Sequence, residues 1–309
     1  MADQLLDRVR ATGLLAPGTD VVVLLSGGRD SVCLLDVAVE LGSSARALHV
    51  NYGLRAEADD DEAHCRALCA GLGVALTVHR TTRPEDAGGN LQGWARDVRY
   101  AVASALAGGD LVAVGHTASD QAETVLYRLA ASPGRRPLLG MQPRSGHLVR
   151  PLLTVTREET GAWCRARGLA WRDDATNDSG EYARGRVRHG LLAALEAVDA
   201  RAAANVVRTS ELLREEAEVL DVVVDNALAG RDRIALLYLA DLPPALGRLV
   251  VRRLAEAATG GLCGRVSGRL EDILALRDDG ALDVGDGARA VVRSGVLHFE
   301  VTPPLPGSS

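Results

Sequence analysis

The sequence predicts an α/β fold in which a doubly wound parallel sheet is followed by a smaller, mainly helical C-terminal domain. Over the first two-thirds of the chain, short apolar runs alternate with helical patterns, which is typical of a parallel sheet covered by helices on both faces. The run at residues 21–25 leads directly into a glycine turn and then into a helical apolar pattern at 32–41. From about residue 190 onward, most of the pattern is helical.

The elements of the first part follow from the spacing of their apolar residues. A short amphipathic helix is expected at residues 4–14, ahead of the first strand. Short runs rich in valine, leucine and alanine predict four strands, at residues 21–25, 45–50, 75–79 and 111–115. Apolar residues at helical spacing predict the helices between them, at about 31–42, 57–72, 90–108 and 119–131.

The last third of the chain has arginine and carboxylate residues between helically spaced apolar positions. Helices are predicted at residues 191–195, 206–213, 219–228, 246–257 and 270–276. Short strands are predicted at 288–293 and 296–301. We therefore place the domain boundary near residue 200, with an α/β domain at 1–200, a helical domain at 201–302 and a disordered tail at 303–309.

Composition limits the class of protein. The hydrophobic fraction of 47% and the charged fraction of 25% are ordinary for a globular chain. No stretch approaches the roughly 20 apolar residues of a membrane span, and the N-terminus lacks a secretory pattern, so we expect a cytoplasmic protein with no membrane contact. The five cysteines are expected to be reduced thiols. Cys65 and Cys69 share a helix face, and we interpret them as core residues rather than as a metal pair.

Basic residues concentrate in the middle of an acidic chain. The net charge is −6, yet residues 121–190 contain 12 arginines against 7 Asp and Glu. Arg135 and Arg136 on a Pro/Gly loop, and Arg184 and Arg188 one helical turn apart, could bind the phosphates of a nucleic acid. Alternatively, arginine merely fills solvated helix faces, because the chain contains no lysine and all 35 basic residues are arginine.

The glycine turn after the first strand is the most informative motif. Its residues are Ser26, Gly27, Gly28, Arg29, Asp30 and Ser31. A strand, turn and helix of this kind directs backbone N–H groups and the positive end of a helix dipole at one point, where a phosphate can bind. Asp30 would repel that phosphate unless a divalent metal lay between them, so the motif predicts pyrophosphate with Mg²⁺. The absence of lysine excludes a Walker loop.

Polar residues also follow the second predicted strand, at the sheet edge where ligands bind in such folds. His49 and Asn51 point to one side of an extended chain, and Asn51 could hydrogen-bond a base or a ribose. Arg55 could reach a phosphate. A strand end with a polar turn explains the same residues without any ligand.

Two further motifs carry candidate catalytic residues. After the fourth strand, Gly115 would allow close approach of adenine, and His116 and Asp120 could orient a nucleophile or a metal. Helix capping alone would also explain Asp120. Arg96 and Arg99 are three apart on a helix and could clamp a phosphate, although an ordinary charged helix face has the same spacing.

Taken together, these motifs resemble the tRNA(Ile)-lysidine synthetase family of the PP-loop, or N-type, ATP pyrophosphatases. That family shows S-G-G-x-D-S, H-V-N-H-G-L-R, A-R-x-x-R-Y, G-H-H-x-D-D-Q-A-E-T, R-P-L-L and R-N-x-x-R in this order. This chain has a counterpart of each motif, beginning at Ser26, His49, Ala95, Gly115, Arg150 and Arg184. The resemblance is close over about residues 20–200 and weaker in the C-terminal domain.

The resemblance implies a PP-loop ATPase fold, like that of the adenine nucleotide alpha hydrolases, and an ATP-dependent ligase. Such an enzyme adenylates the wobble cytidine of the isoleucine tRNA with a CAU anticodon, and L-lysine then displaces AMP to give lysidine. ATP and Mg²⁺ are the implied cofactors. The tRNA and L-lysine are the implied partners, and a homodimer is the assembly that we consider.

The resemblance also implies roles for the candidate residues. The glycine turn would hold the phosphates, together with His49, Asn51 and Gly115 around the nucleotide, and Asp30 would help to bind Mg²⁺. Charge on phosphate would be neutralised by Arg96 and Arg99, while His116 and Asp120 would face the cytidine or the lysine. The tRNA would be gripped by five arginines, Arg55, Arg135, Arg136, Arg184 and Arg188.

The chain departs from the family pattern at several positions, and two other functions stay open. Tyr52 and Thr117 stand where the family has His, Ser119 where it has Asp, and Gly185 where it has Asn. The alternatives are a PP-loop enzyme that inserts sulfur into a tRNA base and a non-catalytic tRNA-binding protein that retains ATP. The spacing of Cys65 and Cys69 differs from the C-x-x-C pair common in the first, and an intact Asp30 argues against the second.

Overall fold

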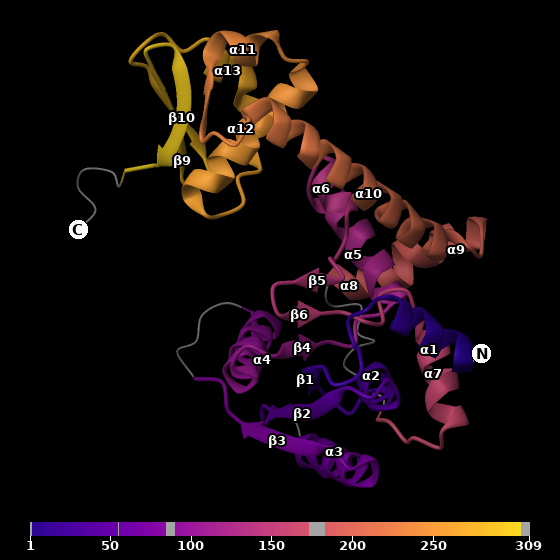
Figure 1. The fold of residues 1–309 in the computed structure, drawn as a ribbon. Coiled ribbons are helices and arrows are strands. Elements are labelled where there is room, and N and C mark those ends of the chain that lie inside the picture. The colour runs from indigo at the N-terminus through magenta and orange to yellow at the C-terminus, as the bar shows by residue number, and fades with distance from the viewer. Residues whose placement is uncertain (1, 55, 85–89, 173–182, 304–309) are drawn as a thin grey trace. The chain divides into compact units, whose positions relative to one another are not determined.

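The computed structural model describes residues 2–54, 56–84, 90–172 and 183–303 (Figure 1). It divides into two compact units, residues Met1–Leu213 and Arg214–Ser309. The predicted tail lies outside the described residues from position 304 onward, and Arg55 lies outside them as well. No helix of the described chain is both long enough and apolar enough to cross a membrane.

A six-stranded sheet forms the centre of the first unit. Its strand order is β3 (Ala75–Arg80), β2 (Ser44–Asn51), β1 (Asp20–Leu24), β4 (Leu111–Ala113), β6 (Leu148–Val149) and β5 (Arg144–Ser145). Neighbouring strands are parallel except β5 and β6, which form an antiparallel pair at one edge. The four strands predicted from the sequence are β1 to β4, and the short pair β5–β6 was not predicted.

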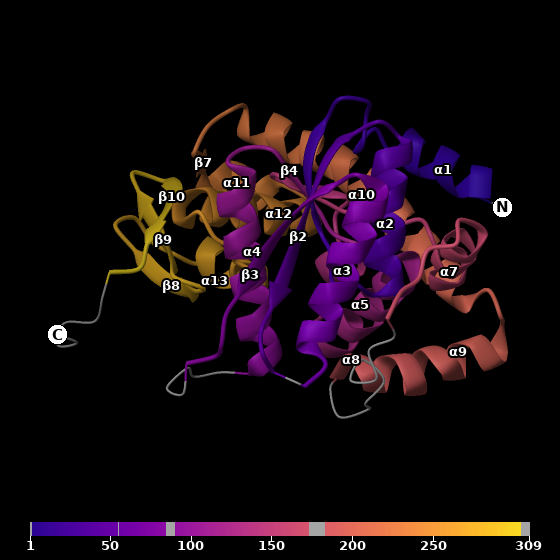
Figure 2. The same ribbon diagram turned by 90° about the horizontal axis from the view of Figure 1, so that it is seen from below.

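Helices cover both faces of this sheet, as the alternation along the chain predicts (Figure 2). One face carries α2 (Arg29–Glu40) and α3 (Ala58–Leu72), with α1 (Ala2–Ala11) and α7 (Arg157–Ala166) packed in the same core. The other face carries α4 (Leu91–Ala107). The doubly wound fold class is therefore confirmed.

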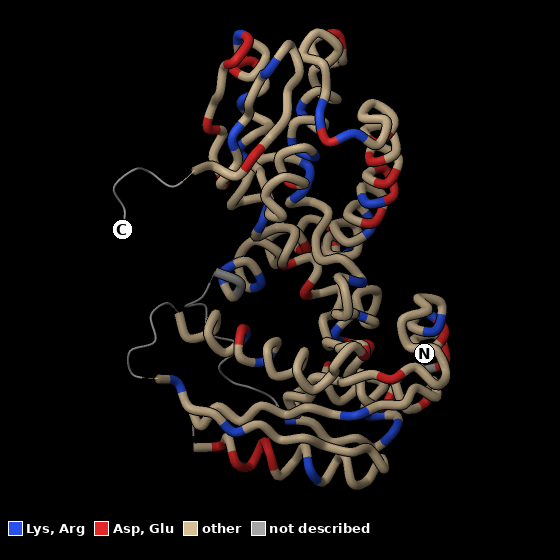
Figure 3. The backbone as a smooth tube through the Cα atoms, turned by 60° about the vertical axis from the view of Figure 1, so that its left-hand side comes forward, with Lys and Arg blue, Asp and Glu red and all other residues tan. Residues whose placement is uncertain are grey.

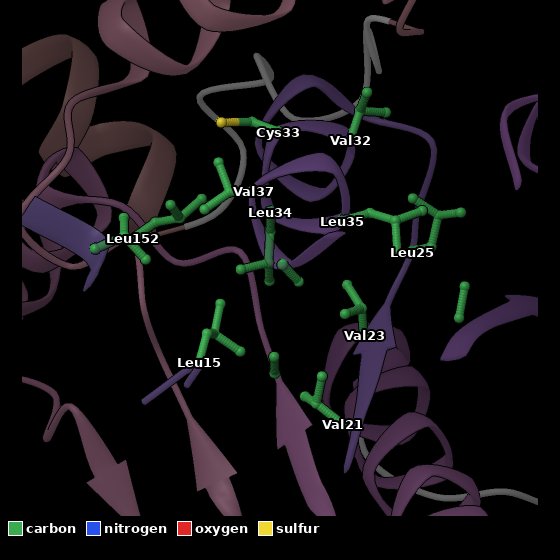
Figure 4. Close-up of a cluster of buried hydrophobic side chains, with 14 of the residues drawn as sticks. Leu15, Val21, Val23, Leu25, Val32, Cys33, Leu34, Leu35, Val37 and Leu152 are labelled. Atoms are coloured by element: carbon green, nitrogen blue, oxygen red, sulfur yellow. The ribbon is translucent and has the colours of Figure 1, made fainter. Parts of the chain in front are cut away.

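Side chains of β1 alternate between the two cores, because successive residues of a strand point to opposite faces. Val21 and Val23 are fully buried against α2, where Figure 4 shows them beside Leu34 and Leu35. Val22 and Leu24 belong to the core under α4. A strand that is buried on both faces has a continuous run of apolar residues in its sequence, and residues 21–25 form such a run.

The remaining helices of the first unit pack together at the end of the α/β part. They are α5 (Ala118–Ala131), α6 (Arg135–Leu138), α8 (Ala183–Arg186), a π-helical turn (Val187–Leu192), α9 (Ala193–Val198) and the start of α10 (Ala202–Leu228). Ala122 and Leu126 of α5 form a small core with Val187 and Leu192. The division between the units falls after Leu213, inside α10, beyond the boundary near residue 200 that the sequence predicts, because one continuous helix crosses both regions.

The second unit is helical and contains a small antiparallel sheet. Its helices are α11 (Leu236–Asp241), α12 (Pro244–Thr259), a 3-10 turn (Arg265–Arg269) and α13 (Leu270–Leu274). The sheet order is β7 (Arg233–Ala235), β10 (Val296–Val301), β9 (Ala288–Arg293) and β8 (Ala281–Gly285). Strands β9 and β10 have the predicted bounds, whereas β7 and β8 were missed because each is short and partly exposed.

The strand order creates a topological switch point beside β1. The chain leaves β1 toward β2 and β3 on one side and returns to β4 on the other. In open α/β sheets, ligands bind beyond the carboxyl ends of the strands at such a switch point. The loops at residues 25–28 and 114–117 follow β1 and β4 there, and α2 begins at Arg29.

Candidate functional site

The glycine loop, residues 26–31, is folded by its own serines. The Ser31 hydroxyl donates to the carbonyl of Gly28 at 2.8 Å and lies 3.1 Å from the Ser26 hydroxyl. The Gly28 N–H donates to the Ser26 Oγ at 3.3 Å. These hydrogen bonds within the loop close the turn between β1 and α2 and hold both serine side chains in place.

The first turn of α2 has no side-chain cap. Gly28 is the N-cap residue, and no side chain accepts a hydrogen bond from the first turn of α2. The first N–H groups of a helix have no partner within the helix, so Arg29, Asp30 and Ser31 present donors at the positive end of the helix dipole. This arrangement fits a phosphate group bound to backbone N–H groups.

Two glycines allow the loop to take this position. Gly27 has φ +85°, and a Cβ there would lie 3.3 Å from Cys65 Sγ on α3. A Cβ on Gly115 would lie 3.0 Å from the carbonyl carbon and oxygen of Asp30. In the structure, Gly115 makes room for the first turn of α2, and the close approach of adenine stays a prediction.

Asp30 sits where α2 meets α7. Its Oδ1 accepts a hydrogen bond from the Thr160 hydroxyl at 2.5 Å and lies 3.3 Å from Arg29 Nε. Its Oδ2 lies 3.6 Å from Arg157 Nε. The Asp30 side chain keeps a fifth of its surface exposed, so it is held in place and still reachable from solvent.

Arg157, at the start of α7, joins three carboxylates. Besides Asp30, its guanidinium lies 2.7 Å from Asp120 Oδ1 and 3.3 Å from Glu123 Oε1. Arg188 binds Glu123 from the other side, with Nε 2.6 Å from Oε1 and Nη2 3.2 Å from Oε2. Reasoning from the sequence assigned no role to Arg157 or Glu123, because a local motif does not report contacts between residues so far apart in the chain.

Asp120 has structural partners at the start of its own helix as well as Arg157. It forms a capping box at the start of α5, where it accepts from the Thr117 N–H at 2.8 Å and from the Thr117 hydroxyl at 2.9 Å. Burial opposes its ionisation, but Arg157, the Thr117 hydrogen bonds and the charge of His116 outweigh burial and hold the pKa of Asp120 below its usual value. Asp120 is therefore an anion at neutral pH.

The carboxylates of this site fit a shared divalent cation only if the ligand supplies further oxygens. The described residues include no group of three or more His, Cys, Asp or Glu side chains that could hold a metal ion by themselves. Mg²⁺ is commonly bound by one or two carboxylates together with substrate phosphates and waters. Asp30, beside the open N–H groups of α2, offers one such carboxylate.

His49 and Asn51 lie near the end of β2. His49 contacts the end of β1, and Asn51 contacts α3. His49 is buried, with Nδ1 2.9 Å from the carbonyl oxygen of Leu25. The Asn51 Nδ2 donates to Glu62 Oε2 at 3.1 Å, and its Oδ1 accepts from the Gly53 N–H at 3.0 Å. Both ends of the Asn51 amide have partners inside the protein, which hold this side chain between β2 and α3.

Glu62 is a further buried carboxylate that the sequence did not single out. Arg80 Nε donates to its Oε2 at 2.9 Å and Arg66 Nε to its Oε1 at 3.0 Å. The hydrogen bond from Arg80, with those from Asn51 and Arg66, overcomes burial and lowers the pKa of Glu62 to about 2. This ion-pair network fixes the start of α3 against β2 and β3.

Arg172 holds the glycine loop from outside. The backbone N–H of Arg172 donates to the carbonyl of Gly27 at 3.0 Å. Its side-chain Nε lies 2.5 Å from Asp61 Oδ1 on α3. The loop is thus supported by α3 and by the segment that follows α7. The residues from 173 to 182 lie outside the described part of the chain.

Arg96 and Arg99 lie on α4 beside Tyr100, as their spacing predicts. Their guanidinium carbons lie 5.2 and 5.7 Å from the centre of the Tyr100 ring. Tyr52, which replaces a family histidine, donates its hydroxyl to the Ala95 carbonyl at 2.8 Å. These side chains lie on the α4 side of the sheet, whereas the glycine loop leads into α2 on the opposite side.

The arginines predicted to bind tRNA lie on different elements and have different partners. Arg135 and Arg136 begin α6, where the sequence predicted a loop. Arg188 is committed to Glu123, and Arg184 lies in α8 with its side chain outside the described part. Along the backbone of each unit, arginines are interspersed with Asp and Glu (Figure 3).

Comparisons with known proteins relate the chain to a single group of enzymes. The family model described as "PP-loop domain" matches residues 3–195. The tRNA(Ile)-lysidine synthase of Symbiobacterium thermophilum is 37% identical over 98% of this chain and 70% of its own length. That of Solibacter usitatus is 38% identical over 85% of this chain and 62% of its own. The chain therefore spans about two-thirds of the length of these relatives.

A solved structure supports the fold alone. The U34-tRNA thiolase NcsA from Methanococcus maripaludis superposes with a TM-score of 0.58 over 69% of this chain and 78% of its own, at 20% sequence identity.

Proposed function

This chain belongs to the tRNA(Ile)-lysidine synthase family of PP-loop proteins, and we propose that it is an ATP-dependent ligase that converts the wobble cytidine of an isoleucine tRNA to lysidine. The cytosine oxygen at base carbon 2 attacks the α-phosphate of ATP, and the bond to pyrophosphate breaks. The amine of L-lysine then attacks base carbon 2 and AMP leaves with the oxygen. The products are lysidine, AMP and pyrophosphate.

The observation that carries this proposal is the open start of α2 at the switch point of the sheet. The uncapped N–H groups of Arg29, Asp30 and Ser31 offer donors to the pyrophosphate as negative charge develops on it. Because the loop is folded by its own hydrogen bonds, these donors are in place before ATP binds. Ser26 and Gly28 maintain that geometry.

Asp30 is the residue that we propose for Mg²⁺. When bound, Mg²⁺ would neutralise phosphate charge that Asp30 alone would repel. Thr160 orients the Asp30 carboxylate by donating to Oδ1, which leaves Oδ2 facing Arg157.

His116 and Asp120 are proposed to face the cytidine or the incoming lysine. The Asp120 carboxylate remains ionised and partly exposed, so it can accept hydrogen bonds from an ammonium group. Ser119, which replaces a family aspartate, accepts a 3.4 Å hydrogen bond from the Arg157 N–H. Glu123 retains the glutamate of the same family motif and is held by Arg157 and Arg188.

We further propose that Arg96 and Arg99 neutralise phosphate charge and that the arginine-rich middle of the chain contacts the tRNA. Arg135, Arg136, Arg184 and Arg55 keep this proposed role. Arg188 is better explained as the partner of Glu123, because its guanidinium makes two contacts with that carboxylate. A tRNA substrate also leads us to expect the enzyme in the cytoplasm.

The sulfur-inserting alternative receives no support from the cysteines. Cys33 lies on α2, Cys164 on α7 and Cys263 in the second unit, while Cys65 and Cys69 share α3. All five are free and buried, and the described residues bring no three of them into a common metal-binding group.

The test is incubation of the protein with ATP, Mg²⁺, isoleucine tRNA and each of the twenty amino acids in turn. We expect release of AMP and pyrophosphate that depends on L-lysine. Turnover supported only by a sulfur donor would favour base thiolation. The absence of any turnover would favour a tRNA-binding protein without catalytic activity.

A further inference from the structure

Helices α2 and α7 meet along a row of polar contacts, of which the proposed function uses only the first. At that first position, the Thr160 hydroxyl of α7 donates to Asp30 of α2. Further along, Trp163 Nε1 donates to Asp36 Oδ2 at 2.7 Å, and Arg167 Nε lies 2.5 Å from the same oxygen. We call this row of contacts the α2–α7 seam. Its contacts follow one another in the same order along both helices.

The two helices approach each other closely at the seam. A Cβ on Gly161 would lie 3.1 Å from Arg29 Cδ, and Cys164 Sγ lies 3.7 Å from the Arg29 carbonyl oxygen. Thr160 and Cys164 are fully buried, and Trp163 is nearly so. Because the packing is tight from the first turn of α2 onward, a shift of α7 at one end of the seam is transmitted to the other end.

Asp36 is a costly residue at the centre of this seam. It is 1% exposed, and its Oδ1 has no hydrogen-bond partner among the described residues. Burial raises the pKa of the Asp36 carboxyl, and the hydrogen bond from Trp163 and the positive charge of Arg167 oppose burial without outweighing it. At neutral pH the ionised carboxylate therefore does not stabilise the fold relative to the unfolded chain. The best-attested use of such buried charges is to fix the register of packed elements.

The contacts of Asp36 can set the position of α7 along α2, because they are directional. Apolar contacts have no preferred direction, whereas a hydrogen bond and an ion pair to one carboxylate are satisfied only in a narrow range of positions. Thr160 lies one helical turn before Trp163, on the same face of α7. The position of α7 that satisfies Asp36 is thus the one in which Thr160 reaches Asp30 Oδ1.

We propose that Asp36 is a positioning residue for the ligation reaction: through Trp163 and Arg167 it fixes α7 along α2, and thereby the direction in which Thr160 holds the Asp30 carboxylate. The inference rests on the proposed function, which takes Asp30 as the residue that binds Mg²⁺. The seam acts on the Asp30 side chain alone. The N–H groups at the start of α2 belong to the helix backbone and do not depend on α7.

The test measures binding rather than turnover. Isothermal titration calorimetry gives the affinity for a non-hydrolysable ATP analogue, once with Mg²⁺ and once with EDTA. Asp36→Leu removes both contacts of the carboxylate, and Trp163→Phe removes the hydrogen bond but keeps an aromatic ring. Thr160→Val removes the hydroxyl that reaches Asp30, and Thr160→Ser keeps one. Glu158→Gln, an exposed carboxylate on the same helix, is the matched control, and circular dichroism verifies that each variant is folded.

Affinity in the presence of Mg²⁺ should fall about five- to tenfold in Asp36→Leu and in Thr160→Val, and in the same direction but less in Trp163→Phe. Affinity in EDTA should stay within about twofold of the wild type, because the backbone donors are unchanged. Thr160→Ser and Glu158→Gln should bind like the wild type. In the double variant of Asp36→Leu and Thr160→Val, the loss should match the larger single loss, because both changes act on Asp30 through the same hydroxyl.

Losses that multiply in the double variant would overturn the proposal, since Asp36 and Thr160 would then act independently. An equal loss with Mg²⁺ and with EDTA would also overturn it, because it would reveal a general distortion of the site. Wild-type affinity in folded Asp36→Leu and Trp163→Phe would do the same. The expected affinities in a protein without lysine-dependent turnover would support the positioning role and contradict only the ligase function.

Discussion

At the scale of single residues, the candidate site is an arrangement of carboxylates, each with a defined partner. Asp30 is held by Thr160 and Arg157, and Asp120 by Thr117 and Arg157. The partners fix the direction of both carboxylates, and those of Asp120 also hold its pKa below the usual value. A cationic ligand at this site therefore meets preorganised anions and must compete with Arg157 for them.

Replacing Asp30 by Asn should lower release of AMP and pyrophosphate by about two orders of magnitude or more, because the amide cannot help to neutralise the phosphate charge through Mg²⁺. Affinity for tRNA, measured by fluorescence anisotropy, should stay within about twofold of the wild type, since the change leaves the positive side chains in place. Asp20→Asn, at the exposed opposite end of β1, is the control. Equal loss of turnover and tRNA affinity would contradict the metal role.

Glu62 makes stability depend on pH. Its pKa in the folded chain is about 2, below its value in the unfolded chain, so it stabilises the fold above the ordinary carboxyl pKa and loses this effect as the pH falls toward 2. Glu62→Gln should reduce the free energy of unfolding by about 1–3 kcal/mol at pH 7. The difference from the wild type should shrink below about pH 4.

Urea denaturation followed by circular dichroism at pH 7, 5 and 3.5 measures this difference. Glu57→Gln, an exposed residue just before α3, should show a small difference that does not change with pH. A Glu62→Gln penalty that stays constant down to pH 3.5 would show that Arg80 and Arg66 do not control the ionisation of this carboxyl.

At the scale of elements, the start of α2 depends on how closely the segment after β4 approaches it. The backbone of Asp30 lies against Gly115 and fills the position of a Cβ. A backbone neighbour cannot move aside as a flexible side chain can. The orientation of the α2 N–H groups is therefore set by a residue 85 positions later in the chain.

Gly115→Ala should displace the first turn of α2 and weaken binding of an ATP analogue by about tenfold or more. The overpacked contact should also lower the free energy of unfolding by about 1–3 kcal/mol. Isothermal titration calorimetry and urea denaturation measure the two effects. Gly71→Ala, near the end of α3 where a Cβ meets open space, should instead stabilise the fold by less than about 1 kcal/mol and leave nucleotide binding unchanged.

At the scale of the whole molecule, the two units have separate cores. The cores around the parallel sheet lie within the first unit, and the core of Val250, Leu254, Ile273 and Leu297 lies within the second. Units with separate cores can unfold as separate cooperative transitions. The glycine loop belongs to the first unit alone.

Differential scanning calorimetry should therefore resolve two transitions. A non-hydrolysable ATP analogue with Mg²⁺, at about 100 times its Kd, should stabilise the first unit by about 2.7 kcal/mol. This corresponds to a rise of about 5–10 °C in its Tm, with the other transition unmoved. A single transition that shifts as a whole would mean that the units unfold together.

Much of the fold could be predicted because the relevant signals are local. Strand β1, the glycine loop and α2 follow one another within about twenty residues, and each has a distinct spacing of apolar residues. Strands β9 and β10 were predicted with their observed bounds for the same reason. The short strands β5 to β8 were not predicted, because they lack the run of consecutive buried apolar residues that identifies β1.

The sequence by itself determined the parallel α/β sheet, the glycine loop with Asp30 and the family to which the chain belongs, since these depend on neighbouring residues. Only the tertiary structure decided which polar groups meet: Arg157 with Asp30, Asp120 and Glu123, Arg188 with Glu123, and Asn51 with Glu62. The reason is physical. Ion pairs and close backbone contacts form between side chains that the topology of the sheet brings together from distant positions, and spacing along the chain contains no record of those distances.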